Sequence, residues 1–99
     1  MIIGVLRLTF RLHENRSLKG KRRMANSLKQ KLRNKFNVAV SEVESLDDHK
    51  RLVLALTTVA NDSRKVESRL SKALAMTEAA ATEELVDSQM EILGIHPET

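Results

Sequence analysis

The spacing of apolar residues constrains the fold of this chain more than any other feature. At the N-terminus, apolar side chains recur in steps of two, which is typical of a strand with one face in the core. After Ser17 the apolar spacing changes to every fourth residue, through Met24, Leu28 and Leu32. That period is typical of an amphipathic helix. The sequence therefore predicts an initial strand over residues 2–12, then a helix over residues 18–36 with Ser17 as its N-cap.

The rest of the chain predicts two more strands, a second helix and a last strand. These elements cover residues 37–44, 51–60, 63–81 and 84–93. The order βαββαβ is most simply buried as a ferredoxin-like α+β sandwich, with a four-stranded antiparallel sheet and both helices on one face. We expect a single domain over residues 1–93 and a disordered C-terminal tail over 94–99.

Positive charge gathers between Arg16 and Lys35. The formal net charge of the chain is +4, and no acidic residue lies between Glu14 and Glu42. On a helix, most of these bases fall opposite the apolar residues, and the first of them lie near the positive end of the helix dipole. This arrangement favours contact with phosphate groups, and a solvated amphipathic face is the alternative. The predicted phosphate-binding residues are Arg16, Ser17, Lys19, Lys21, Arg22, Arg23, Lys29 and Arg33.

Two lysines of this stretch lie closer to the apolar side of the predicted helix. Lys21 and Lys35 are more suited to snorkelling or to an ion pair than to binding a ligand, so the phosphate-binding prediction rests mainly on the first helical turns. In the predicted topology the end of this helix approaches Arg64 and Lys65 at the start of the second. That approach would let the basic stripe continue across both helices.

The sheet face away from the helices is a second candidate site. Its apolar residues are too many to be left in water, which predicts a protein partner or a homodimer. The predicted partner face consists of Ile3, Val5, Arg7, Val53, Ala55 and Val59. RNA-recognition domains of this topology stack bases on aromatic residues of this face, but the chain has no Tyr or Trp. Any RNA would therefore be recognised through its backbone and shape.

The sequence contains no residue set that fits an enzyme, a metal centre or a cofactor site. It has no Cys, three isolated His and only three Gly, which excludes thiolate chemistry and glycine-rich phosphate loops. The acids and His49 around residues 42–49 could hold a hard cation, but they lack calcium-loop spacing and are read as a solvated turn. No apolar run is long enough to span a membrane, and we expect a cytoplasmic protein.

Several ordered segments of the chain carry a family resemblance. They are the opening MIIGVLRLTFRLHENRSLKGKRR, then LRNKFNVAVSEVES, and the ND before the second helix with the VESRLSKAL that follows. Together they resemble the YlxP-like family of small bacterial proteins of unknown function. The resemblance implies a ferredoxin-like domain with no assigned activity. The family's genes often lie near those for ribosome-binding factor A and translation initiation factor two, which implies a role around RNA or the ribosome.

The basic segment of that family falls on Ser17, Leu18, Lys19, Lys21, Arg22 and Arg23, and its second signature falls on Asn61 and Asp62. The chain departs from the pattern at four positions. Gly20 stands where an acid would complete a capping box with Ser17. Arg69, Met76 and Thr77 replace apolar or aromatic residues in the second helix.

These observations predict a non-catalytic RNA- or ribosome-associated protein that acts in ribosome maturation or translation. In this hypothesis the basic helix docks electrostatically on phosphates. The alternative hypothesis is a dimeric interaction or regulatory module that uses the sheet face and has no role with nucleic acid.

Overall fold

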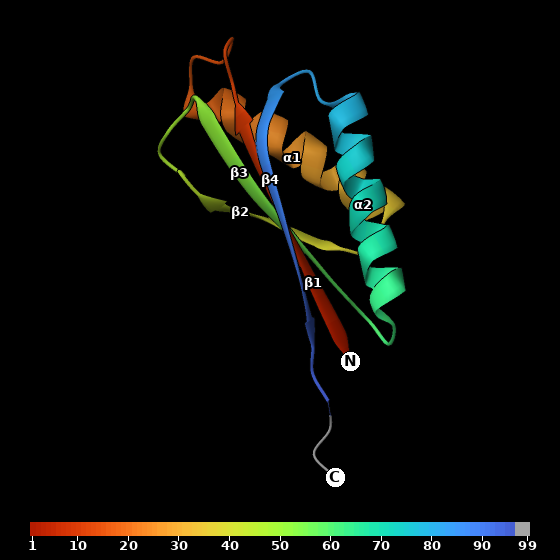
Figure 1. Cartoon of the computed structure of the whole chain (residues 1–99). Helices are drawn as coiled ribbons and strands as arrows, with labels where there is room; N and C mark the ends of the chain where they lie inside the picture. Colours follow the sequence, from red (N-terminus) through yellow and green to blue (C-terminus); the bar gives the residue numbers. More distant parts are fainter. Residues whose placement is uncertain (97–99) are drawn as a thin grey trace.

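A computed structural model describes residues 1–96 and shows the predicted order of elements (Figure 1). All six elements begin and end within two residues of the predicted positions. They are β1 (Ile2–Arg11), α1 (Leu18–Lys35), β2 (Ala39–Glu44), β3 (Arg51–Ala60), α2 (Ser63–Ala80) and β4 (Glu84–Gly94).

The four strands form one antiparallel sheet in the order β2-β3-β1-β4. With two helices packed against the sheet, this is the predicted ferredoxin-like α+β arrangement. The even-numbered residues of β1 face the helices, and Leu6, Leu8 and Phe10 are fully buried. Leu56 of β3 and Met90 of β4 lie opposite Leu6 on the two neighbouring strands. The alternation in the sequence thus gives the correct buried face of the central strand.

The two helices cover different parts of the sheet and make little direct contact with each other. α1 packs mainly on β2 and β3, whereas α2 packs on β1, β3 and β4. Figure 1 shows the helices inclined to one another, with the end of α1 beside α2. α2 approaches β1 closely at Gly4, where an added Cβ would lie 2.3 Å from Val66 Cγ1.

The start of α1 explains why a glycine occupies position 20. Ser17 is the N-cap, and its Oγ accepts a hydrogen bond of 3.0 Å from the Gly20 N–H. A Cβ on Gly20 would lie 2.3 Å from Asn15 Oδ1. The Asn15 amide donates hydrogen bonds to the carbonyl oxygens of Ser17 and His49. Gly20 therefore leaves room for an asparagine that ties the helix start to the turn after β2.

The unusual residues of α2 also have structural partners. Thr77 is fully buried, and its hydroxyl donates to the Ala73 carbonyl oxygen at 2.9 Å. Arg69 donates hydrogen bonds to Thr58 Oγ1 and the Val59 carbonyl oxygen on β3. The Thr77 hydroxyl thus adds a hydrogen bond within α2, and the Arg69 side chain attaches α2 to β3. An apolar residue at either position could only pack against its neighbours.

The predicted tail begins too early. Gly94 is the last residue of β4, and Ile95 exchanges backbone hydrogen bonds with Met1. The pairing with β1 thus continues past residue 93. Residues 97–99 of the predicted tail lie outside the described part of the chain.

Lys21 is the one basic residue of α1 that lies in the interior, with only 1% of its surface exposed. Its Nζ donates to three carbonyl oxygens, those of Ser45 (2.6 Å), Leu46 (3.2 Å) and Arg51 (3.2 Å). Nζ also lies 2.8 Å from Glu42 Oε2. The ammonium group is thus surrounded by one carboxylate and three carbonyl oxygens. Lys21 therefore anchors α1 to the β2–β3 hairpin.

Replacing Lys21 with methionine should destabilise the fold strongly. Lys21→Met keeps the aliphatic stem but leaves a largely buried carboxylate and three carbonyl oxygens without their partner. Removing one member of a buried pair typically costs about 3–5 kcal/mol. Urea denaturation should show a loss of that order in the free energy of unfolding.

Lys19→Met is the matched control, because Lys19 is exposed two residues earlier on the same helix. It should change the free energy of unfolding by less than about 0.5 kcal/mol. Equal losses in the two variants would contradict the anchoring role of Lys21.

Candidate nucleic-acid interface

The outward side of α1 carries a row of accessible bases. Arg16, just before the helix, and Lys19, Arg22, Arg23 and Arg33 are exposed, and Lys29 is partly exposed. None of the six forms an ion pair within residues 1–96. Apart from the buried Lys21 and the uncharged Ser17, the predicted phosphate-binding residues therefore carry accessible charges that no acid compensates within residues 1–96.

Lys21 has to be removed from the predicted phosphate-binding set. Its ammonium group is buried, and its donors are used within the protein. The expectation that Lys21 lies near the apolar side and forms a pair describes it correctly. Ser17 also has a structural role, because its hydroxyl caps the helix.

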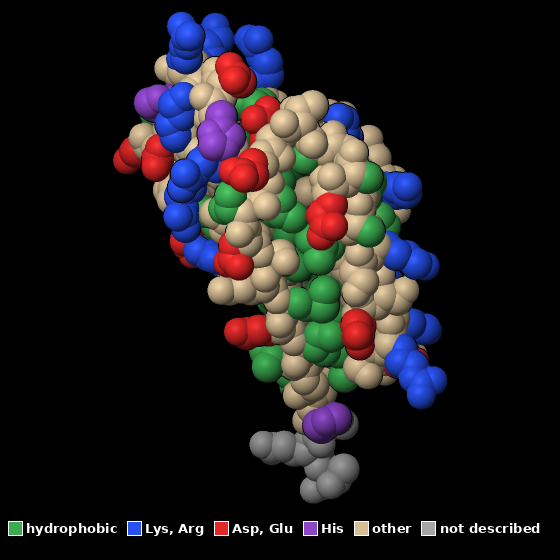
Figure 2. All heavy atoms as spheres, turned by 45° about the horizontal axis from the view of Figure 1, so that its top comes forward, with side chains coloured by type: hydrophobic (Ala, Val, Ile, Leu, Met, Phe, Trp, Pro, Cys, Tyr) green, Lys and Arg blue, Asp and Glu red, His purple; other side chains and the backbone are tan. Residues whose placement is uncertain are grey.

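Positive charge lies mainly on the helical layer, whereas negative charge gathers on β4 of the sheet. α1 contains no acid, whereas β4 carries Glu84, Asp87 and Glu91 and no base. Figure 2 shows a row of Lys and Arg side chains along its right-hand edge, where Figure 1 places α2, and most acids of that view lie away from this edge. A polyanion would therefore be attracted to the helical layer rather than to the β4 edge.

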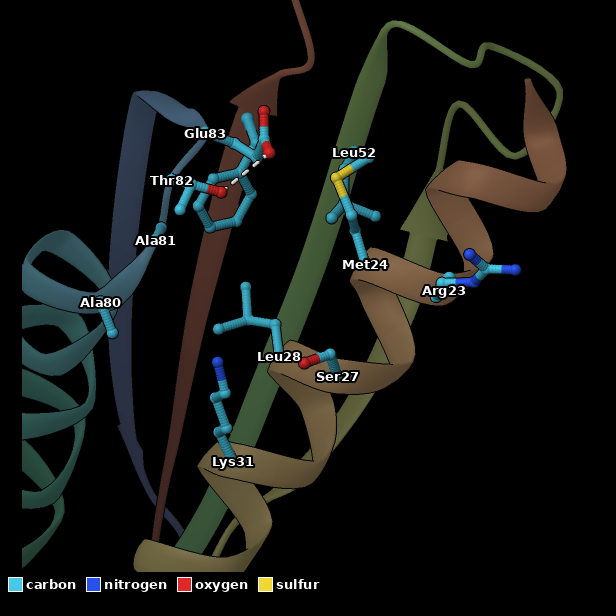
Figure 3. Close-up of a pocket in the computed structure, with 11 residues that line it drawn as sticks. Arg23, Met24, Ser27, Leu28, Lys31, Leu52, Ala80, Ala81, Thr82 and Glu83 are labelled. Atoms are coloured by element: carbon cyan, nitrogen blue, oxygen red, sulfur yellow. Dashed lines mark hydrogen bonds between the residues drawn. The ribbon is translucent and has the colours of Figure 1, made fainter. Parts of the chain in front are cut away.

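An apolar groove of about 310 Å³ separates the middle of α1 from the end of α2. Phe10 and Leu52 of the sheet line it, together with residues of both helices. Figure 3 shows Leu28 and Lys31 projecting from α1 toward the segment that contains Ala80 and Ala81. The groove follows from the lack of direct packing between the two helices.

The outer sheet face is less apolar than the sequence predicts. Val53, predicted to lie on the partner face, has no exposed surface. Arg7 on β1 reaches Glu44 on β2 through two hydrogen bonds of 3.0 and 2.6 Å, so its side chain must cross β3, which lies between them. Because Glu44 lies opposite Val53 in the register, this pair extends toward Val53. Val53 is therefore not part of an accessible surface, and Arg7 is occupied by its pair.

Apolar residues remain exposed at one end of the outer face. Ile3 lies between Val59 of β3 and Leu93 of β4 in the register, and Val5 follows on β1. The exposed fractions of Val5, Val59 and Leu93 are 37%, 55% and 56%. We call Ile3, Val5, Val59 and Leu93 the outer apolar patch. Leu93 was absent from the predicted face, although its place one residue after the inward-facing Ile92 was a signal for it.

A register shift between β1 and β4 explains a further difference from simple alternation. A β-bulge at Thr9/Phe10 places Leu85 opposite Phe10. Val86 is then 48% exposed instead of continuing the row of Ser88, Met90 and Ile92. Periodicity alone does not predict which residues of a strand face the core beyond such a bulge, because one extra residue exchanges the inward-facing and outward-facing positions.

The chain matches a known protein family. A family model described as protein of unknown function (DUF503) matches residues 3–90. The chain belongs to the DUF503 family. The match runs from β1 into β4 and so includes the basic helix and the outer sheet face. No curated protein matches the chain.

The described part of this DUF503 chain does not assemble a metal-binding group of three His, Asp or Glu side chains. Residues 1–96 also contain no helix long and apolar enough to cross a membrane. The basic helical layer, the groove and the outer sheet face are the candidate sites described above.

The ion pair between Arg7 and Glu44 shifts the pKa of both groups. The hydrogen bond from Arg7 lowers the pKa of Glu44 below its ordinary value of 4.5, and the attraction of the Arg7 charge adds to this effect. The same hydrogen bond raises the pKa of Arg7, with Asp87 of β4 at 3.9 Å as a further contact. The charged form of the pair is therefore the stable form at neutral pH.

The Arg7–Glu44 pair should make part of the stability of this DUF503 protein depend on pH. Because folding lowers the pKa of Glu44, its contribution is present above pH 4.5 and is lost as the pH falls through the lowered value. Urea denaturation at pH 7 should show Glu44→Gln to be less stable than the wild type. At pH 3 the difference should shrink.

Glu91→Gln is the control, since Glu91 is exposed on β4 and forms no ion pair within residues 1–96. Its difference from the wild type at pH 7 should be small. A pH-independent effect of Glu44→Gln would count against this pair.

Proposed function

We propose that this DUF503 protein is a non-catalytic RNA- or ribosome-associated protein that docks on phosphate groups through the outward side of α1. The observation that carries the proposal is the row formed by Lys19, Arg22, Arg23, Lys29 and Arg33, accessible and without an acidic partner in the described residues. Surface helices commonly mix charges of both signs, which gain stability from i,i+4 pairs. A helix that forgoes these pairs has its charges available for an external anion.

The dimensions of α1 suit a nucleic-acid backbone. Its 18 residues span about 27 Å at 1.5 Å per residue, enough to contact several phosphates in succession. Binding of this kind is electrostatic and largely independent of sequence. Base stacking has no aromatic platform on the sheet, because Phe10 is buried and Phe36 lies at the end of α1.

The resemblance to the YlxP-like family supports a place in translation or ribosome maturation. The genes of that family often neighbour those of translation factors, and an RNA partner of this kind would place the protein in the cytoplasm. The bases Lys19, Arg22 and Arg23 belong both to the family-like segment and to the accessible row.

The salt dependence of RNA binding tests the proposal. Lys19→Gln combined with Arg22→Gln should weaken binding to a single-stranded RNA oligonucleotide and to 30S ribosomal subunits. For the oligonucleotide, the slope of log K against log salt should become less steep by about 1.4, since each lost phosphate contact on a single strand contributes about 0.7.

The matched control combines Arg11→Gln with Arg51→Gln. These two exposed arginines face each other on β1 and β3, so the same charge is removed from the other layer. The control should keep the wild-type slope. If the helix variant also keeps the wild-type slope and affinity for both ligands, the proposal is wrong.

The outer apolar patch favours a second candidate function, a homodimeric interaction module. Ile3, Val59 and Leu93 lie side by side on three strands, and Val5 extends the patch. Burying such a patch against a second copy would remove apolar surface from water.

Sedimentation velocity tests the dimer. The wild type should sediment as a dimer, and Val59→Asp should shift it to the monomer by placing a charge in the patch. Val43→Asp, at an exposed bulge residue of β2, should leave the dimer intact. A wild-type monomer at millimolar concentration would exclude this function.

A further inference from the structure

A second basic site lies where the end of α1 meets the first half of α2. The two helices and the residues after α1 surround an open cleft of about 550 Å³. Its lining includes five bases, Lys35, Arg64, Lys65, Arg69 and Lys72, and no acid. The other lining residues are Phe36, Asn37 and Ser68. We call this the interhelical basic cleft.

Helical spacing explains why the bases of α2 gather on one side. Lys65, Arg69 and Lys72 follow one another at intervals of four and three residues, which places them in one row along the helix. Arg64 and Ser68 form the adjacent row. The acid Glu67 does not line the cleft. The cleft therefore keeps its positive charge although α2 contains acids.

The cleft has one fixed cation and several free ones. Arg69 is held by its hydrogen bonds to Thr58 and Val59, and Lys65 has a long contact of 3.4 Å to Asn61 Oδ1. None of the five bases forms an ion pair within residues 1–96. Like charges at these helical spacings repel one another and destabilise the helix. A bound anion would relieve this repulsion.

We propose that the interhelical basic cleft is a binding site for adjacent phosphate groups. Five positive charges from two helices exceed what a single carboxylate would neutralise, whereas linked phosphates carry several negative charges in a small volume. Such phosphates belong either to a free nucleoside polyphosphate or to an RNA strand. The cleft is separate from the first turns of α1 and does not depend on RNA binding there.

Inorganic tripolyphosphate is the probe for the site, because it contains linked phosphates and nothing else. Titration of the full chain, followed by amide NMR, should shift the signals of residues 35–37 and 64–72. The double variant Lys65→Gln with Lys72→Gln should weaken this binding about tenfold or more, as expected when two of five cations are removed. Both lysines are exposed, so the variant should fold as the wild type does.

The control is the double variant Arg11→Gln with Arg51→Gln on the sheet layer, which lowers the net charge equally. It should change tripolyphosphate affinity by less than about threefold, since the two bases lie outside the cleft. Equal losses of tripolyphosphate affinity in the two variants would show that the effect depends on net charge alone, and would overturn the proposal. Amide shifts absent or scattered over the whole basic surface would overturn it as well.

Two further ligands identify the source of the phosphates. If the cleft variant loses affinity for a nucleoside triphosphate but not for an RNA oligonucleotide, the natural ligand is a free nucleotide. If it loses affinity for the oligonucleotide, the cleft extends the RNA-binding surface. Failure of the α1 proposal would appear separately, as an unchanged salt slope in the Lys19/Arg22 variant.

Discussion

The interaction on which the rest of the structure depends is the buried ammonium group of Lys21. It joins the first turns of α1 to the turn between β2 and β3 through three carbonyl oxygens and the Glu42 carboxylate. A fixed inward direction at Lys21 also fixes the rotation of the helix about its axis. At about 100° per residue, Lys19 and Arg23 then point away from the sheet and Arg22 points to the side. Lys21 itself contacts no ligand, but it orients the surface bases of α1 that are proposed to bind phosphate.

The sequence contains enough periodicity to predict the sheet, both helices and the buried face of β1. It also contains a signal for Lys21, which shares a seven-residue repeat with Leu18, Ala25, Leu28 and Leu32. This repeat agrees with the prediction that Lys21 lies near the apolar side. Its full burial was not predictable from the helix alone, because lysine is almost never fully buried without a partner. The partner, Glu42, is distant in sequence, and its direction into the core depends on the alternation of β2 before the bulge at Val43. Such pairs become visible only when strands and helices are placed together.

The candidate sites differ in how far local sequence determines them. The basic row of α1 follows from a single helix and was predictable apart from Lys21 and Ser17. The accessible residues of the outer sheet face were not fully predictable. Arg7 crosses a neighbouring strand to reach Glu44, and a bulge changes the register of β4. The interhelical basic cleft lies between these cases. Arg64 and Lys65 could be placed near the end of α1 from topology, but Arg69 and Lys72 required the packed position of α2.

The separation of charge between α1 and β4 makes the molecule an electric dipole. In the field of a polyanion a dipole experiences a torque as well as an attraction, so it turns before it touches. Rotational search is normally what slows association between two specific surfaces. A molecule that is pre-aligned loses less time in unproductive collisions, and this gain disappears as salt shortens the Debye length. In the proposed docking on RNA, the acids of β4 would thus favour the correct orientation without contacting the ligand.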